Sequence, residues 1–221
     1  MKLIDMTLTD FIEEVDSTSP APGGGSVAAL ASDIGVGLSR MMAHLSFGKK
    51  KYESLEHMKQ LDGDVERLGV WGLEFDSFDE IRKELNKLID EDTNSFNEFM
   101  KAIKMPKETF KQITERQKAL ADATLYSIKV PYKTAQLSLE AMKQLDFLVT
   151  NGNQNAITDI GVGILMLCTG LEGAILNVKV NLKGLEQKDL SRKYYESCEE
   201  MLQEGKEIRD KLLFIIHESV E

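Results

Sequence analysis

Prolines are scarce in this chain, and the long stretches between them repeat apolar residues at helical spacing. The four prolines stand at positions 20, 22, 106 and 131. Because proline interrupts or starts helices, these positions divide the chain into few segments. Strand-like alternation of apolar and polar residues is nearly absent. The sequence therefore predicts an all-α fold, a bundle of long helices, and its length predicts a single domain over residues 1–221.

The expected elements follow from this pattern and from capping residues. A short helix is expected from Thr7 or Thr9 to about Val15. Longer helices are expected over 26–46, 54–61, 79–104, 107–128, 131–149, 154–180 and 189–219. Pro131 suits the first position of a new helix, which separates two of them. Residues 61–79 carry three glycines around Trp71 and are interpreted as a loop.

The net charge, the cysteine content and the apolar segments argue against several classes of protein. The formal net charge is −10, and such a surface repels phosphate backbones, so nucleic-acid binding is not expected. Cys168 and Cys198 are too few for a disulfide framework, which fits a reducing cytoplasm. The N-terminus lacks the apolar segment of a signal peptide. The uncharged run Ile160–Leu171 has 12 residues, whereas a membrane span needs about 20, so no membrane association is expected.

Three consecutive glycines precede the 26–46 helix. Gly23, Gly24 and Gly25 form a loop, and Ser26 suits the N-cap of the helix that follows. A glycine loop at a helix N-terminus can hold an anion on its free N–H groups. The same loop can instead allow a tight turn between packed helices. The local sequence leaves both interpretations open.

One carboxylate lies on an apolar face. In the 79–104 helix, the apolar stripe runs along Leu85, Leu88, Ile89, Phe96, Phe99 and Ile103, and Asp92 falls in its middle. A carboxylate there is costly unless it is paired or hydrogen-bonded. Asp92 is therefore either a structural ion pair or cap, or a site carboxylate whose pKa is tuned by its surroundings.

The 154–180 segment shows a second polar pattern. Asp159, Asn177 and Asn181 lie near one helix face, which also carries small residues. The glycines of this face favour close helix packing. Asparagine amides both donate and accept, so they can also bind the edge of a heterocycle. On the 26–46 helix, Asp33, Arg40 and His44 likewise share a face, without forming a recognisable catalytic motif.

Lys49 and Lys50 belong to a basic cluster after the glycine helix. The cluster is either a solvated helix end or an attractant for an anionic substrate. No group of His, Cys, Asp or Glu has the spacing of metal ligands, so no metal site is expected. The GGGS loop lacks the ending of a nucleotide-binding P-loop.

An ordered set of motifs resembles a known family. PAPGGGSVAAL, FGKKKYESL, DEDTNSFNEFMKAIKMP, a VP pair at 130–131, GNQNAITD and NVKVNL follow one another along nearly the whole chain. In this order they resemble the family of the cyclodeaminase half of formiminotransferase-cyclodeaminase and of methenyltetrahydrofolate cyclohydrolases. The matching positions are Pro22, Gly23, Gly24, Gly25, Ser26, Asp90, Asp92, Phe96, Pro106, Pro131, Gly152, Asn153, Asp159, Asn177 and Asn181.

The resemblance implies an all-helical homodimer that performs tetrahydrofolate one-carbon chemistry without a metal, nucleotide or other cofactor. Two departures stand out: the 61–79 excursion is longer than the family pattern, and Asp33 stands where a small residue is usual. The expected function is formimidoyltetrahydrofolate cyclodeaminase. Methenyltetrahydrofolate cyclohydrolase is the alternative within the family, and a non-catalytic helical dimer that serves as an interaction module is the alternative outside the enzymes.

The chemistry of this reaction suggests roles for the polar residues. Asp92, and second Asp159, would move protons and stabilise a developing cation. Asn177 and Asn181 would hold the pterin edge, and Asn153 joins them as a substrate-binding residue. The remaining substrate-binding residues would receive a carboxylate of the folate tail. These are Gly24, Gly25, Ser26, Lys49 and Lys50.

Overall fold

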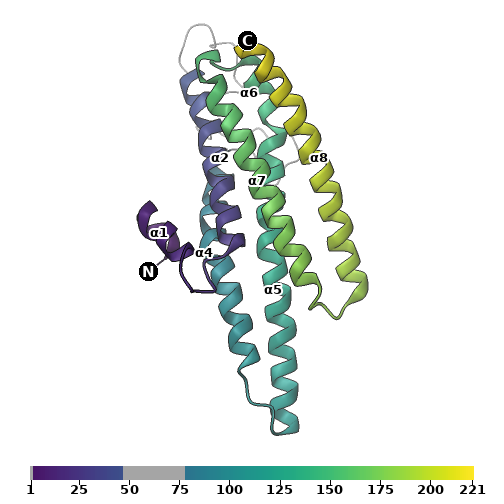
Figure 1. Ribbon diagram of the computed structural model, residues 1–221. Coiled ribbons are helices and arrows are strands. Elements are labelled where there is room, and N and C mark those ends of the chain that lie inside the picture. Colours follow the sequence, from purple (N-terminus) through teal and green to yellow (C-terminus); the bar gives the residue numbers. More distant parts are fainter. Residues whose placement is uncertain (1, 47–77) are drawn as a thin grey trace.

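The computed structural model describes residues 2–46 and 78–221, and within these ranges the chain is helical and has no strand (Figure 1). The all-α prediction is confirmed. The α-helices are α1 (Leu8–Val15), α2 (Gly24–Ser46), α4 (Phe78–Ile103), α5 (Phe110–Lys143), α6 (Leu145–Asn151), α7 (Ile157–Leu182) and α8 (Lys188–Val220), with short 3₁₀ turns η1 (Leu3–Asp5) and η3 (Gln154–Ala156).

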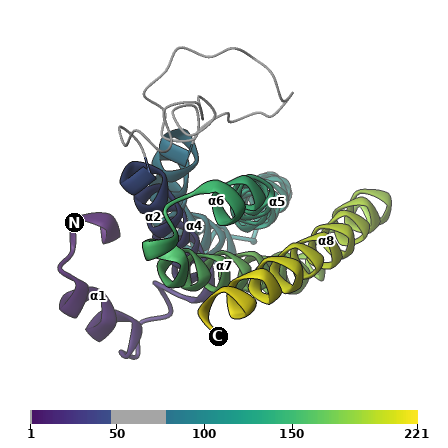
Figure 2. The same cartoon turned by 90° about the horizontal axis from the view of Figure 1, so that it is seen from above.

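Helix α7 lies at the centre of the bundle. It packs against α2, α5 and α8, while α4 closes the bundle against α2 and α5. Seen from above, α8 runs along the outside of α7, and α1 stands apart from the other helices (Figure 2). The core is built from apolar residues of these helices, among them Met42, Leu85, Ile128, Leu167 and Leu171.

Small residues let α2 and α7 approach at backbone distance. A Cβ at Gly35 would lie 2.8 Å from the carbonyl oxygen of Gly163, and a Cβ at Gly170 would lie 2.7 Å from that of Ala28. Both distances are too short for a real side-chain atom. The interpretation of the α7 glycines as close packing residues is therefore confirmed.

Helix α5 differs from the prediction. The expected helices over 107–128 and 131–149 are wrong, because one helix runs from Phe110 to Lys143 with Pro131 inside it. Buried apolar residues on both sides of the proline, such as Ile128 and Ala135, anchor α5 in the core. Their burial outweighs the missing hydrogen bond at Pro131. The chain then breaks at Gln144, and the short α6 follows.

The other described helices agree with the sequence pattern to within a few residues. Thr7 caps α1 by accepting from the N–H of Asp10. The expected helix over 54–61 and most of the 61–79 loop lie outside the described residues, although Phe78 already begins α4. Both cysteines, Cys168 and Cys198, are free and buried.

One described segment, Gln154–Leu182, is long and apolar enough to cross a membrane by length and composition. Of its most apolar window, 56% is buried inside the protein. This segment contains α7, which packs on three other helices. Its apolar character is therefore accounted for by its place in the core.

Candidate active site

The N-terminus of α2 meets the middle of α4. The N–H of Ser26 donates to Oδ2 of Asp92 at 2.9 Å. The Ser26 hydroxyl lies 3.2 Å from the same carboxylate oxygen and 2.8 Å from the carbonyl of Ile89. The prediction of Ser26 as an N-cap is wrong, because α2 already begins at Gly24. Asp92, from another helix, satisfies one of the free donors of this first turn instead.

Two glycines make this arrangement possible. A Cβ at Gly25 would lie 2.1 Å from Oδ1 of Asp92, so only glycine leaves space for the carboxylate. A Cβ at Gly24 would lie 3.3 Å from Nδ2 of Asn177 on α7. The glycine loop therefore brings the carboxylate of α4 and an amide of α7 against the same helix end.

Burial raises the pKa of Asp92 above its ordinary value, although the hydrogen bonds from Ser26 work in the opposite direction. No Lys or Arg of the described ranges forms an ion pair with this carboxylate. Thr93, which the sequence analysis did not single out, lies beside the same group, its hydroxyl 3.3 Å from that of Ser26. A half-buried acid with a raised pKa holds its proton more tightly than an exposed one, which suits a role in proton transfer.

The two asparagines of α7 make different contacts. Nδ2 of Asn177 donates to the carbonyl of Gly173 on its own helix at 2.9 Å. Nδ2 of Asn181 donates to the carbonyl of Ser127 at 2.7 Å and so links α7 to α5. The structure thus places Asn177 at the α2 N-terminus, whereas the Asn181 amide is engaged in packing two helices.

Asn153 and Asp159 lie at the other end of the bundle. The backbone N–H of Asn153 donates to the hydroxyl of Ser46, and its Nδ2 donates to the carbonyl of Leu45, at the end of α2. Since α2 runs from Gly24 to Ser46, this end is roughly 33 Å from the glycine loop. Asp159, in the first turn of α7, shares a helix face with Asn177 but lies about 27 Å from it along the axis.

Apart from Asn181, the predicted site residues that the structure describes fall into two groups within one chain. The first holds Gly24, Gly25, Ser26, Asp92 and Asn177, and the second holds Asn153 and Asp159. Lys49 and Lys50 lie outside the described residues.

Asp33 and Arg40, which share a face of α2, form ion pairs with different residues of α4. Asp33 pairs with Arg82 of α4 at 3.0 Å, and Arg40 pairs with Asp79 at 3.0 Å. Asp33 and Arg40 therefore each bind to α4 rather than to each other. Burial raises the pKa of Asp33 despite its arginine partner.

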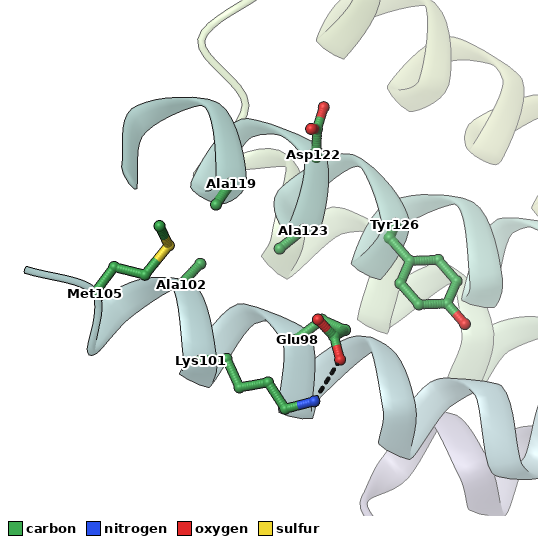
Figure 3. Close-up of a pocket in the computed structure, with 8 residues that line it drawn as sticks. All are labelled: Glu98, Lys101, Ala102, Met105, Ala119, Asp122, Ala123 and Tyr126. Carbon is green, nitrogen blue, oxygen red and sulfur yellow. Dashed lines mark hydrogen bonds and ion pairs between the residues drawn. The ribbon is translucent and has the colours of Figure 1, made fainter. Parts of the chain in front are cut away.

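A pocket of about 310 Å³ lies between α4 and α5 (Figure 3). Ala102, Met105, Ala119 and Ala123 form its apolar wall, and Tyr126 stands at one end. An ion pair between Glu98 and Lys101 borders it. Glu98 follows Asp92 by six residues, about 9 Å along α4.

Metal ligands are not grouped in the described part of the chain. No three His, Cys, Asp or Glu side chains there lie close enough to hold one metal ion. The chemistry of the α2 N-terminus rests instead on one carboxylate, one hydroxyl, one amide and backbone N–H groups.

Known proteins resemble this chain over almost its whole length. The mouse formimidoyltransferase-cyclodeaminase is 31% identical over 92% of this chain, which spans 36% of the mouse protein. The methenyltetrahydrofolate cyclohydrolase of Methylorubrum extorquens is 28% identical over 93% of both chains. The crystal structure of a formiminotetrahydrofolate cyclodeaminase from Thermotoga maritima has the same fold, with a TM-score of 0.82 at 22% identity and 98% coverage of both chains.

The family model of formiminotransferase-cyclodeaminase matches residues 7–200, which include the glycine loop and every candidate residue named above. The resemblance carried by the motifs is confirmed, and the chain belongs to the formiminotransferase-cyclodeaminase family.

Proposed function

We propose that this protein is a folate one-carbon enzyme, a formimidoyltetrahydrofolate cyclodeaminase. It would convert 5-formiminotetrahydrofolate to 5,10-methenyltetrahydrofolate and ammonia. The observation that carries the proposal is Asp92, a half-buried carboxylate with a raised pKa, held by Ser26 at a glycine-lined helix end. The names of the cyclohydrolase from Methylorubrum extorquens and of the cyclodeaminase from Thermotoga maritima both contain tetrahydrofolate.

The reaction requires a proton to move between two nitrogens. The formimino group reacts in its protonated form, –CH=NH2+. N10 of the substrate attacks its carbon and loses a proton, and the resulting amino group gains that proton and leaves as ammonia. The remaining carbon is shared by N5 and N10 in the methenyl cation. A single carboxylate can accept the first proton and deliver it to the leaving nitrogen. As an anion, it also stabilises the developing cation.

The neighbouring residues fit supporting roles. Ser26 holds the Asp92 carboxylate in place, and Asn177 offers its amide beside Gly24 to the pterin edge. Because Asp92 occupies the N–H of Ser26, a substrate carboxylate would depend on Gly24 and on Lys49 or Lys50. Asn153, Asn181 and Asp159 remain proposed site residues, and the reaction is proposed to need no metal or other cofactor.

The cyclohydrolase reaction is the second candidate. It opens the same methenyl cation with water, and one carboxylate can serve as its base. The observation in its favour is the cyclohydrolase of Methylorubrum extorquens, which this chain matches along 93% of both lengths. By contrast, the chain spans about a third of the bifunctional relatives.

A non-catalytic scaffold is less well supported. A structural carboxylate on a core face would be expected to pair with a buried Lys or Arg. Asp92 instead contacts Ser26 and has no such partner in the described ranges.

The enzyme is further proposed to work as a homodimer in the cytoplasm. Helices α2 and α7 lie side by side and expose apolar side chains on one face of the molecule. Leu176 is 67% exposed and Val180 is 55% exposed. The same face carries Val27, Ile34, Leu45, Val162 and Leu165. A second copy seated on this face would remove these side chains from water.

An antiparallel pairing would also unite the two groups of site residues. The α2 N-terminus of one protomer would then lie beside the α2 C-terminus of its partner, and Asp92 would approach the partner's Asp159. Mixing the inactive Asp92→Asn and Asp159→Asn proteins should then restore part of the activity, because heterodimers hold one intact site. If mixing restores nothing, the site is not shared between copies.

A spectrophotometric assay tests the proposed function. The purified protein is offered 5-formiminotetrahydrofolate in one cuvette and 5,10-methenyltetrahydrofolate in another, and the methenyl absorbance is followed. A rise in the first cuvette with release of ammonia identifies a cyclodeaminase. A fall in the second beyond the spontaneous rate identifies a cyclohydrolase. The variant Asp92→Asn should abolish either activity. Glu98→Gln is the control and should keep the activity, because Glu98 is an exposed carboxylate on the same helix. If the wild type shows no turnover in either cuvette, the cyclodeaminase and the cyclohydrolase proposals are both refuted.

A further inference from the structure

A cluster of cations surrounds a second pocket, at the junction of α7 and α8. The pocket measures about 380 Å³ and is lined by Lys179, Leu182, Lys183, Lys188, Ser191, Arg192 and Tyr195. Four of these seven side chains carry a positive charge, in a protein whose formal net charge is −10. Such a concentration of one sign around a concave surface attracts the opposite charge.

Three of these cations have no ion-pair partner in the described part of the chain. Lys183, Lys188 and Arg192 form no ion pair with any described residue. Lys179 is different, because its amino group pairs with Glu199 and lies 5.3 Å from the centre of the Tyr195 ring. That pairing fixes Lys179 at the pocket wall and leaves the other three charges available.

The chemistry of the lining defines the ligand class. Lysine and arginine donate charge-assisted hydrogen bonds to carboxylate and phosphate oxygens. The hydroxyls of Ser191 and Tyr195 supply further donors at the same surface, and Leu182 supplies an apolar contact. Three free cations match a ligand that bears at least two negative charges, and the pocket volume of about 380 Å³ is sufficient for a small molecule.

This pocket is separate from the candidate active site. Lys179 follows Asn177 by two residues, which turns its side chain by about 200° around α7. Asn177 accordingly meets α2, whereas Lys179 meets α8. The end of α7 therefore presents the Asn177 amide on one side and the Lys179 amino group on the other.

From these observations we propose that the pocket at the α7–α8 junction binds a compact polyanion, a small phosphate compound or a di- or tricarboxylate. The site does not depend on the proposed folate chemistry. Lys183, Lys188 and Arg192 supply the charge, and Ser191 and Tyr195 supply the hydroxyl donors.

Isothermal titration of the full chain with pyrophosphate and, separately, with citrate tests this site. We expect saturable binding of one anion per chain, and the tighter of the two ligands tells phosphate from carboxylate chemistry. The double variant Lys183→Gln/Arg192→Gln should weaken this binding at least about tenfold, because each lost charge removes a close Coulomb contact. Added salt should weaken the wild-type binding as well.

A matched double variant provides the control. Lys107→Gln/Lys118→Gln removes two exposed charges that do not line the pocket, and it should bind as the wild type does. Asp92→Asn should also retain the binding, which separates this site from the proposed function. The proposal is overturned if the wild type binds neither anion saturably, or if the control pair loses as much affinity as the pocket pair.

Discussion

The backbone N–H of Ser26 and the carboxylate of Asp92 are joined by a 2.9 Å hydrogen bond across 66 residues of sequence. This bond makes a side chain of α4 the cap of α2. Charged acceptors at a helix N-terminus are favoured by its partial positive charge. The same contact holds the proposed catalytic carboxylate in a defined position, so capping and chemistry depend on one residue.

Substitutions in the glycine loop should have graded effects. A methyl group at position 25 would overlap the Asp92 carboxylate, so Gly25→Ala should displace it and lower kcat by at least about 100-fold, the scale of lost acid–base catalysis. Gly24→Ala meets Asn177 at 3.3 Å and should cost much less. At Gly23 the nearest atom would be 3.8 Å away, and Gly23→Ala serves as the control. Equal kinetics of the three variants would contradict this role of the loop.

The dependence of kcat/KM on pH should change when the Ser26 hydroxyl is removed. Its hydroxyl donates to the charged form of Asp92 and lowers the pKa of that carboxyl. Ser26→Ala should therefore raise this pKa and shift the acid limb of kcat/KM to higher pH. Ser95→Ala is a matched control, because its hydroxyl donates to the backbone carbonyl of Asp92 rather than to the carboxylate. A shift of the same size in both variants would argue against a direct effect on Asp92.

Stability should also depend on pH through Asp92. Its pKa in the folded chain lies above the ordinary 3.8, so the folded state binds this proton more tightly than the unfolded state. This contribution to stability is fully present below pH 3.8 and is lost as the pH rises through the folded pKa. The Tm of the wild type minus that of Asp92→Asn should therefore fall from pH 4 upward and then level off. A difference that rises with pH would refute the assignment.

Two glycines of α2 should respond oppositely to alanine. At Gly35 a methyl group would press on the backbone of α7, with the Gly163 oxygen at 2.8 Å, and should destabilise the fold by about 1–3 kcal/mol. At Gly37 no atom lies within 4 Å, so alanine should stabilise the helix by up to about 1 kcal/mol. Denaturant unfolding of the two variants measures both effects. Similar losses of unfolding free energy in the two variants would contradict a close α2–α7 contact at Gly35.

Much of the fold was accessible from the sequence because helical periodicity is local. The bounds of α4 and α8 follow from apolar spacing that extends over many turns. The position of Asp92 on an inward face was predictable for the same reason. Pro131 was misinterpreted because its effect depends on the burial of Ile128 and Ala135, which only the packed bundle determines.

The sequence allowed the residues of the candidate site to be predicted, but not which of them meet in the folded chain. Periodicity gives the angle of a residue around a helix, so Asp159 and Asn177 were placed on one face correctly. Their separation of about 27 Å prevents them from meeting within one chain. The cap of α2 was assigned to Ser26 by a local rule, whereas the acceptor, Asp92, comes from a different helix. Contacts of this kind depend on tertiary packing.

The capping of α2 by α4 also has a consequence for biosynthesis. The acceptor for the Ser26 N–H lies 66 residues further along the chain, so α2 is synthesised before Asp92. Until α4 is synthesised and docked, the first turn of α2 exposes its glycines and its N–H groups to water. The beginning of α2 therefore reaches its final form only after α4 has been made, together with the carboxylate on which the proposed reaction depends.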